Sequence, residues 1–370
     1  MNHDEAVIVE YEFEASTGDP RATAEFVALE QTLEVPRAIV DEHGLGDWVG
    51  EIAELHPASP ETDGRPRARV RYRAELTHHS VIPLLNLLIG NVSIVRGVRI
   101  VDLELPAGVL ASFRGPRSGI EGIRAKLAVP LRPLLATALK PRGASDETLA
   151  RVAGEFARGG GDLIKDDHNL ADRSVSAFRD RISRVRDSVR ANGSTLYCAH
   201  FAPRREEFEA ALTAVEEEEI DGVLVEPFLL GLDTTRWLAE RFSGIVLAHP
   251  AATGSLYVNP GQGIDVGVLL GTLFRLCGVD GSVFPHAGGR FDLSEAECSA
   301  IADRLRRPLA QIAPAWPLPA GGMQYERIGE LVEFYGRDAM LLIGGALLRD
   351  EAPLAKSTER FREAIERATR

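Results

Sequence analysis

The segment GGGDLIKDDHN, residues 159–169, carries the densest group of reactive side chains in the chain. If DLIKDD forms a strand, Lys165 and Asp167 share one face and Asp166 takes the other, because side chains alternate along a strand. His168 then lies just past the strand end. A structural ion-pair network is one interpretation, and the composition of the segment alone favours it. The other is a metal site in which a carbamylated Lys165 donates oxygen beside Asp167, since a protonated lysine has no lone pair.

A second lysine, Lys140, ends an apolar run in TALKPRGAS, and Pro141 stops that run. Such a lysine can act as a general base or acid if its neighbours lower its pKa. The alternative is a salt bridge to Asp167 or Glu226. Because a lone buried ammonium is costly, we expect Lys140 to have a function or a charged partner.

Three histidines each end a separate apolar run: His200, His249 and His286. A single histidine in this position could be a core residue with satisfied hydrogen bonds. Three in equivalent positions indicate that at least one contacts substrate. Glu226 also ends a run, and either supports a neighbouring group or caps the following loop.

Two glycine pairs end two further runs, Gly321-Gly322 and Gly344-Gly345. Loops of this kind bind phosphate through backbone N–H groups in many barrels, and glycine allows the backbone to approach closely. One pair would be weak evidence, since turns use glycine freely. Two pairs at successive strand ends favour a phosphate site.

All of these residues are positioned by eight short apolar runs in the C-terminal two-thirds of the chain. Stretches with helical periodicity separate the runs, and alternating buried strands and helices indicate a parallel sheet. Eight such units predict a closed (β/α)8 TIM barrel, in which the strand C-terminal ends carry the active site. The predicted strands are 134–141, 162–167, 194–200, 221–227, 244–250, 281–287, 316–322 and 339–345. The predicted helices are 145–158, 173–191, 204–218, 233–242, 262–276, 293–308, 325–336 and 350–369.

The first 120 residues have a different pattern and predict a separate α+β domain of ferredoxin-like type, followed by the barrel over 121–370. Alternating apolar and polar side chains indicate strands, and helical periodicity with an Asp19-Pro20 start signal indicates the first helix. The expected strands are 6–13, 67–76 and 95–106, and the expected helices are 20–31 and 82–91.

Composition narrows the class of protein. The chain has 370 residues, of which 45% are hydrophobic, enough for two domains with a large core. The net charge of −13 argues against nucleic acid as a partner, although a basic pocket for an anionic substrate remains compatible with it. Three cysteines without metal spacing suggest a reducing cytoplasm. We expect no signal peptide, no membrane span and a cytoplasmic location.

With these residues in view, the chain resembles the RuBisCO superfamily, and specifically its RuBisCO-like (form IV) members. The similar motifs follow in matching order and cover most of the chain. They are IGNV (89–92), LKPRGAS (139–145), GGGDLIKDDHN (159–169), FRDRI (178–182), PAGGM (319–323) and LIGGA (342–346). None would suffice alone, and together they are specific.

The resemblance implies a role for each matching residue. Lys165 would be the carbamylated lysine and Asp167 a metal ligand, with His168 where the family has a glutamate ligand. Lys140 would handle protons at the substrate carbons, and His249 would belong to the catalytic set. Substrate and phosphate would contact a wider group. Asn91, also a member of the catalytic set, and Glu30 would arrive from the N-terminal domain of a partner subunit. The remaining contacts would be Gly321, Gly322, Gly344, Gly345, His286 and Arg290.

Departures from the family pattern predict a different reaction. The loop HAGGRFDLSEAE (286–297) has Arg290 and no lysine, whereas the carboxylase has a lysine there that supports CO₂ addition. Pro250 and Ala320 stand where an arginine and a serine would help to hold a second phosphate. We therefore expect one phosphate on the substrate and no carboxylation of ribulose bisphosphate.

The resemblance implies metal-stabilised enediolate chemistry with Mg²⁺, or with Mn²⁺ or another divalent cation, and with CO₂ as the lysine carbamate. Our first hypothesis is a decarboxylase of a 3-oxo sugar-acid phosphate such as 3-oxo-isoapionate 4-phosphate, acting as a homodimer with shared active sites. The second is an isomerase or enolase-type enzyme on a sugar phosphate such as 5-methylthioribulose 1-phosphate. A non-catalytic regulatory barrel is a third class, against which Lys140, Lys165 and Asp167 count and which His168 leaves open.

Overall fold

The computed structural model describes residues 6–289, 291, 293–349 and 352–370. Contacts divide the chain into two compact units. The first unit comprises Met1–Arg114, Ala252–Leu269 and Ala310–Ile312, and the second comprises Gly115–Ala251, Leu270–Leu309 and Ala313–Arg370. The sequence prediction placed one boundary at residue 120. A single boundary cannot describe the two later segments that group with the first unit.

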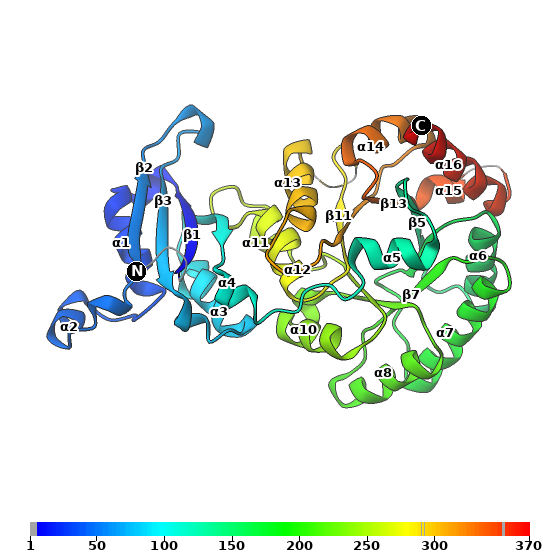
Figure 1. Ribbon diagram of the computed structural model, residues 1–370, viewed down its shortest axis with the longest axis horizontal. Helices are drawn as coiled ribbons and strands as arrows, with labels where there is room; N and C mark the ends of the chain where they lie inside the picture. Colours follow the sequence, from blue (N-terminus) through cyan, green and yellow to red (C-terminus); the bar gives the residue numbers. More distant parts are fainter. Residues whose placement is uncertain (1–5, 290, 292, 350–351) are drawn as a thin grey trace. The chain divides into compact units, whose positions relative to one another are not determined.

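The first unit is built on a sheet whose strands follow the order β10-β4-β1-β3-β2 (Figure 1). Strands β1 to β4 pair antiparallel, with helices after β1 and β3, which is the ferredoxin-like arrangement predicted from the sequence. The short strand β10 adds to the edge of β4 in parallel. The strands are β1 (Ala6–Phe13), β2 (Glu51–His56), β3 (Arg67–Arg73), β4 (Val98–Glu104) and β10 (Gly263–Ile264).

Local sequence signals explain the helices of this unit. Asp19 caps the first one by accepting a hydrogen bond from the Ala22 N–H at 3.1 Å, as its Asp-Pro start predicts. The α-helices are α1 (Pro20–Glu30), α2 (Arg37–Glu42), α3 (Val81–Ile89), α4 (Ala107–Leu110) and α11 (Gly254–Tyr257). The 3₁₀ turns are η2 (Ala15–Thr17), η3 (Gly46–Trp48), η4 (Pro60–Thr62), η5 (Ala74–Thr77) and η6 (Asn91–Ile94).

The second unit is a closed barrel of eight parallel strands, so the predicted fold class is confirmed. Around the barrel the order is β11-β12-β13-β5-β6-β7-β8-β9, with β9 paired to β11. Each strand lies within a predicted apolar run. The bounds are β5 (Leu134–Leu139), β6 (Leu163–Asp166), β7 (Leu196–His200), β8 (Gly222–Val225), β9 (Ile245–Ala248), β11 (Gly281–Pro285), β12 (Trp316–Ala320) and β13 (Met340–Leu342).

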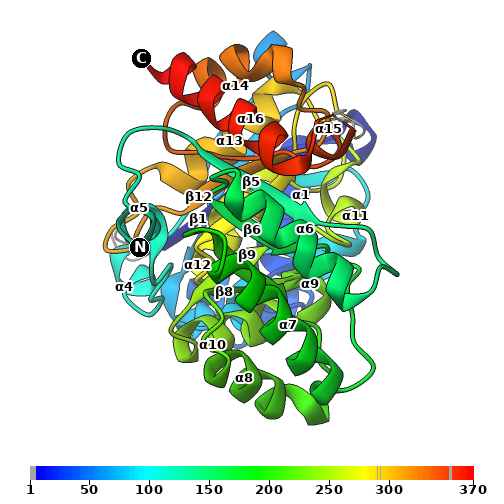
Figure 2. The ribbon, with the colours of Figure 1, turned by 90° about the vertical axis from the view of Figure 1, so that its right-hand side faces the viewer.

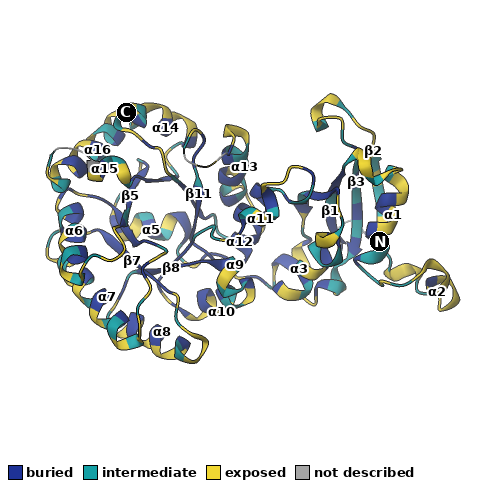
Figure 3. Ribbon diagram, turned by 180° about the vertical axis from the view of Figure 1, so that it is seen from behind, coloured by how far each residue is buried: buried dark blue, intermediate teal, exposed yellow. Residues whose placement is uncertain are grey.

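Helices surround the barrel and turn their apolar faces towards it. Figure 2 shows α6, α7 and α8 side by side on its outside, and Figure 3 shows buried strands inside helices whose outer faces are exposed. The longer helices are α5 (Gly119–Leu127), α6 (Asp146–Arg158), α7 (Val175–Arg190), α8 (Phe208–Glu217), α10 (Leu232–Arg241), α13 (Glu295–Arg306), α14 (Ile328–Tyr335) and α16 (Leu354–Thr369). The short ones are η7 (Arg205–Glu207), α9 (Pro227–Leu230), α12 (Phe274–Leu276), η9 (Tyr325–Arg327) and α15 (Gly345–Arg349).

One predicted helix, over 262–276, was wrong in its first part. Gly263 has a φ of 102° and pairs with Arg99, so that residues 263–264 form strand β10 instead. A π-helical segment, Gly267–Leu273 (η8), and the short α12 follow. Glycine reaches this backbone conformation without strain, and the edge of β4 supplies the hydrogen-bond partners.

Buried aspartates fasten the N-terminal end of the barrel. Asp162 precedes β6 and accepts from Leu135 N at 2.7 Å, and Asp280 precedes β11 and accepts from Val246 N at 2.9 Å. Asp221, before β8, accepts in the same way from a backbone N–H of β7. Carboxylates that satisfy neighbouring backbone donors hold adjacent strands together at this end. The opposite end is left for chemistry.

Two findings bear on the class of protein. Within the described ranges, no helix has the length and apolar character needed to cross a membrane. The cysteines Cys198, Cys277 and Cys298 are buried and free.

Candidate active site

The barrel interior changes from apolar to charged towards the C-terminal ends of its strands. Leu163 packs in the core of the barrel, so the alternation along β6 turns Lys165 and then Asp167 to the same side. Leu196 and Cys198 place His200 likewise at the end of β7. The alternation of side chains along the strands, as predicted from the sequence, therefore brings these groups together at one rim.

Lys165 lies deep in this rim and is 2% exposed. Its ammonium donates to the Asp166 carbonyl oxygen at 2.9 Å. Burial lowers the pKa of Lys165 to about 8, and the charge of Lys140 acts in the same direction, although Asp167 opposes both. A neutral amine, the form that reacts with CO₂, is therefore well populated slightly above neutral pH.

Asp167 is the centre of the polar contacts. Its Oδ2 lies 2.6 Å from Lys140 Nζ, and its Oδ1 accepts from Asn169 N at 3.0 Å and from Asn169 Nδ2 at 2.9 Å. Burial would raise the pKa of Asp167, but the Lys140 and Asn169 hydrogen bonds outweigh it and hold that pKa well below its usual range. The carboxylate is consequently ionised at neutral pH, with the Lys140 ammonium as its cationic partner.

His168 and His249 stack against each other, with ring centroids 4.0 Å apart and planes 14° apart. His168 Nδ1 lies 3.5 Å from Asp167 Oδ1, and its Nε2 lies 3.1 Å from Asn169 Nδ2. Burial, followed by the charge of Lys165, lowers the pKa of His249 to about 2. Its buried Nδ1 has no hydrogen-bond partner among the described residues. The stack therefore brings a neutral imidazole with an unused nitrogen to the rim.

His200 proves to be a histidine with satisfied hydrogen bonds. Its Nε2 lies 2.9 Å from Glu226 Oε1, and its Nδ1 lies 2.8 Å from the Leu170 carbonyl oxygen. Burial tends to lower the pKa of His200, but the hydrogen bond and charge of Glu226 outweigh this and raise it. Glu226, ambiguous in the sequence, is thus the partner of a buried imidazole.

Asp166 points away from the rim, as the alternation predicts. Arg181 of α7 donates to its Oδ2 at 2.6 Å, and Tyr197 donates to its Oδ1 at 2.9 Å. Arg181 also pairs with Asp172 at 2.9 Å. This buried network fixes β6 against α7, so the ion-pair interpretation describes Asp166 rather than Lys165.

The glycine pairs stand at the ends of β12 and β13. Gly321 and Gly322 have φ values of 86° and 70°, which favour glycine. A Cβ on Gly322 would come 2.8 Å from Gly289 Cα, so two loops touch through glycine backbones here. A Cβ on Gly344 would meet no atom within 4 Å. Backbone at both strand ends is therefore accessible to a small anion.

His286 is not brought to the Lys165 cluster. It follows β11, and its Nδ1 lies 2.8 Å from the Tyr335 hydroxyl of α14. The second ring nitrogen, Nε2, is buried without a hydrogen-bond partner among the described residues. Arg290, predicted in the same loop, lies outside the described residues.

Glu30 and Asn91, distant in sequence, are direct partners in the first unit. Asn91 Nδ2 donates to Glu30 Oε1 at 2.8 Å. Glu30 is the last residue of α1, and Asn91 is the first of η6. The two residues that the family pattern assigns to this domain thus form one polar pair.

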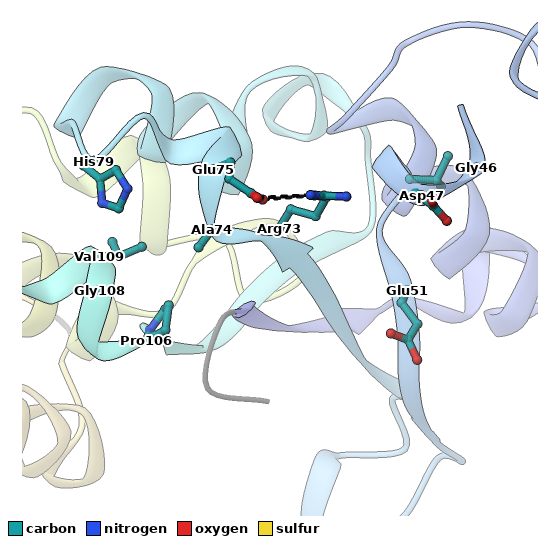
Figure 4. A pocket seen from close by; sticks show the side chains of 11 residues that line it. Gly46, Asp47, Glu51, Arg73, Ala74, Glu75, His79, Pro106, Gly108 and Val109 are labelled. Carbon is teal, nitrogen blue, oxygen red and sulfur yellow. Dashed lines mark hydrogen bonds and ion pairs between the residues drawn. The ribbon is translucent and has the colours of Figure 1, made fainter. Parts of the chain in front are cut away.

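An open hollow of about 780 Å³ in the first unit contains none of the predicted site residues (Figure 4). Its one arginine, Arg73, pairs with Glu75 at 3.0 Å and lies over the Trp48 ring at 4.5 Å. This hollow is therefore not where the predicted chemistry lies, and the residues at the barrel rim are the candidate site.

The donor set at the rim fits a metal only if Lys165 is modified. Among the described residues, no group of three or more His, Cys, Asp and Glu side chains is arranged to hold a metal ion. Asp167 and His168 provide two donors, and a carbamate on the buried, readily deprotonated Lys165 would provide a third.

Comparison with known proteins places the chain in a family. A model of the ribulose bisphosphate carboxylase large chain, catalytic domain, matches residues 119–368. The chain belongs to the RuBisCO large-chain family. Its relatives include ribulose bisphosphate carboxylase-like protein 1 of Rhodopseudomonas palustris, which is 39% identical over 98% of both chains.

Two further members of the RuBisCO family are informative. The crystal structure of a Rubisco-like protein from Rhodopseudomonas palustris superposes with a TM-score of 0.87 and 35% identity over 98% of both chains. A protein of Rhodospirillum rubrum named 5-methylthioribulose-1-phosphate isomerase is 32% identical over 95% of this chain and 94% of its own length. The chain is thus similar to RuBisCO-like members along nearly its whole length.

Sequence reasoning missed two partners of the predicted site residues. Asn169 lies within the motif, and its position two residues after Asp167 is the only local signal that it could cap that carboxylate. Tyr335 contacts His286 from a helix 49 residues away. No local pattern indicates a contact of that kind.

Proposed function

We propose that the chain is a metal-dependent enzyme that stabilises an enediolate formed from a phosphorylated sugar acid. The observation that carries the proposal is the buried Lys165 beside Asp167, with Lys140 only 2.6 Å from that carboxylate. The carbamate of Lys165, Asp167 and His168 would hold Mg²⁺, or Mn²⁺ or another divalent cation. When bound, the cation supplies positive charge for the oxygens on which negative charge develops.

The residues of the chain divide the remaining tasks. Lys140 has a half-exposed ammonium and moves a proton at the substrate carbon. His249 belongs to the catalytic set, and its neutral imidazole stacks on His168 beside Asp167. The backbone at Gly321, Gly322, Gly344 and Gly345 holds the phosphate.

Decarboxylation of a 3-oxo sugar-acid phosphate, such as 3-oxo-isoapionate 4-phosphate, is the first choice of reaction. It runs in the reverse sense of carboxylation and passes through the same kind of intermediate. No lysine is present in 286–297 to support CO₂ addition. Decarboxylation releases CO₂ and does not require a loop that captures it, so the absence of this lysine is compatible with the reaction.

An isomerase or enolase-type reaction on a sugar phosphate such as 5-methylthioribulose 1-phosphate is the second candidate. The relative that is named as an isomerase of this compound supports it at 32% identity. The same site could serve, because proton transfer beside a carbonyl also generates an enediolate. The two reactions differ in product, since one releases CO₂ and the other gives an isomer of equal mass.

We further propose one phosphate on the substrate, a cytoplasmic location and a homodimer with shared active sites. Pro250 and Ala320 provide no charged or hydroxyl side chain for a second phosphate. The buried free cysteines fit a reducing compartment. The Glu30–Asn91 pair gives the first unit a polar group to contribute to a partner's barrel.

Incubation with a panel of phosphorylated sugar acids and with 5-methylthioribulose 1-phosphate tests the proposal. CO₂ release and product mass would be recorded for the wild type, for Lys165→Ala and for the surface variant Lys126→Ala. Lys165-dependent CO₂ release from a sugar acid supports the decarboxylase, and a Lys165-dependent isomer supports the second candidate. Turnover that survives in Lys165→Ala would exclude both.

A further inference from the structure

Gln31 follows Glu30 directly and forms the C-terminal cap of α1. The residue is 7% exposed, and its side-chain amide is fully used. Nε2 donates to the Leu87 carbonyl at 2.8 Å and to the Asn86 carbonyl at 3.1 Å. Oε1 accepts from Val92 N at 3.0 Å. A single buried amide therefore joins α1 to backbone groups of α3 and η6.

These contacts lie on both sides of Asn91. Helix α3 ends at Ile89, and η6 begins at Asn91, with Gly90 at the break. A Cβ on Gly90 would come 2.6 Å from the Asn86 carbonyl oxygen, so the turn is tight. Broken helices leave backbone donors and acceptors that need partners. Gln31 satisfies them before the break, at Leu87, and after it, at Val92.

Two consecutive residues thus hold Asn91 in different ways. Glu30 accepts from the Asn91 side chain at 2.8 Å, and Gln31 holds the main chain on either side. We propose that Gln31 is the positioning residue that fixes the Glu30–Asn91 pair for the substrate. The inference rests on the proposed function, in which this pair completes the active site.

Removal of the Gln31 amide would leave a buried carbonyl and a buried N–H without partners. Such groups cost free energy, and the turn would move to reach water or other donors. Asn91 would then lose its fixed distance from Glu30. A misplacement of roughly 1 Å at a reacting group can lower a rate about 100-fold.

The test compares Gln31→Met in the wild type and in Asn91→Ala, using the Lys165-dependent turnover found with the substrate panel. Gln311→Met is the matched control, since the Gln311 amide also donates to a helix-end carbonyl of the first unit, Leu110, at 2.6 Å. Gln31→Met should lower kcat about 10- to 100-fold. It should cause no further loss in Asn91→Ala, because its effect passes through Asn91. Equal losses in both backgrounds, or none, would overturn the inference.

Gln31→Glu provides a second test that does not depend on the folding of Gln31→Met. A protonated carboxyl group can donate to one of the two carbonyls, Leu87 or Asn86, and accept from Val92 N, whereas a carboxylate faces both carbonyls without a proton. The kcat of this variant relative to the wild type should therefore rise as pH falls. A ratio independent of pH would contradict the proposal. Amide hydrogen exchange at Val92, measured without substrate, should be faster in Gln31→Met and unchanged in Gln311→Met.

Different outcomes would contradict the proposed function and the role of Gln31. Full turnover in Asn91→Ala and in Glu30→Ala would remove the pair from the proposed function and leave Gln31 nothing to position. Loss of turnover in those variants, with normal kcat in Gln31→Met, would overturn only the role of Gln31.

Discussion

Lys140 Nζ lies 2.6 Å from Asp167 Oδ2, so the expected proton-transfer residue and the expected metal ligand are each other's partner. A divalent cation held by Asp167 would compete with the Lys140 ammonium for the same carboxylate. Metal binding would thereby release Lys140 towards the substrate. In the proposed function, the pair would thus link metal binding to the availability of Lys140 for proton transfer.

Lys165 should make metal binding depend on CO₂. Only the carbamate turns this lysine into an oxygen donor, and the other residues that the structure describes offer too few ligands. Titration calorimetry with Mg²⁺ should show tighter binding in bicarbonate buffer than in CO₂-free buffer for the wild type. Lys165→Ala should abolish both this difference and turnover while keeping its fold by circular dichroism, with Lys126→Ala as the control. Full activity in Lys165→Ala, or in chelator-treated wild type, would falsify the metal model.

His168 should shift the choice of metal. Imidazole suits Mn²⁺, Zn²⁺ or Fe²⁺ better than Mg²⁺, whereas carboxylate suits Mg²⁺. The variant His168→Glu should therefore show turnover that shifts from Mn²⁺ towards Mg²⁺ in a metal series. Asn169 contacts both Asp167 and His168, so Asn169→Ala should disturb the site without changing the donor type. An identical metal profile in wild type and His168→Glu would show that His168 is not a ligand.

Shared sites predict complementation between two subunits whose activity is impaired by different substitutions. Asn91→Ala removes the donor to Glu30, and Lys165→Ala removes the carbamate, each from a different unit of the chain. Mixed dimers of the two variants regain one intact site, so part of the activity should return after unfolding and refolding together. Confirmed hybrid dimers without activity would place each complete site within a single chain.

The barrel and its charged rim could be predicted because both depend on local alternation. The short apolar runs fix the strands, and the period of two turns Lys165 and Asp167 inwards and Asp166 outwards. Contacts made by distant residues could not be predicted. Glu226 contacts His200 only because β7 and β8 are neighbours in the barrel. His286 contacts Tyr335 only because α14 packs nearby.

Segment 262–276 shows the same limit in the fold. Its apolar periodicity predicts a helix, yet the edge of β4 captures residues 263–264 as a strand. The competing hydrogen-bond partner lies more than 150 positions earlier in the chain. Tertiary pairing therefore outweighed local propensity.

The His200–Glu226 pair should make stability fall with rising pH. Because the folded pKa of His200 is raised, its stabilising effect is complete below the unfolded value of about 6.5 and is lost as pH rises through the folded pKa. Urea unfolding of the wild type should show this decline above about pH 6.5, and His200→Asn should flatten it. His43→Asn, at the end of α2, serves as the control. A wild-type slope retained in His200→Asn would assign the effect to another group.

Gly344→Ala isolates the phosphate site from effects on folding. The added Cβ meets no protein atom within 4 Å and the backbone does not have a positive φ, whereas a side chain at Gly322 would be strained and would crowd Gly289. If the phosphate approaches this backbone, the methyl group should weaken its charge-assisted hydrogen bonds and raise KM about 10- to 100-fold.

Gly329→Ala, equally uncrowded but within α14, should leave KM unchanged, and both variants should melt like the wild type. The substrate without its phosphate should bind the wild type and Gly344→Ala with equally low affinity. Unchanged KM in Gly344→Ala, or measurable carboxylation of ribulose bisphosphate, would contradict the one-phosphate model.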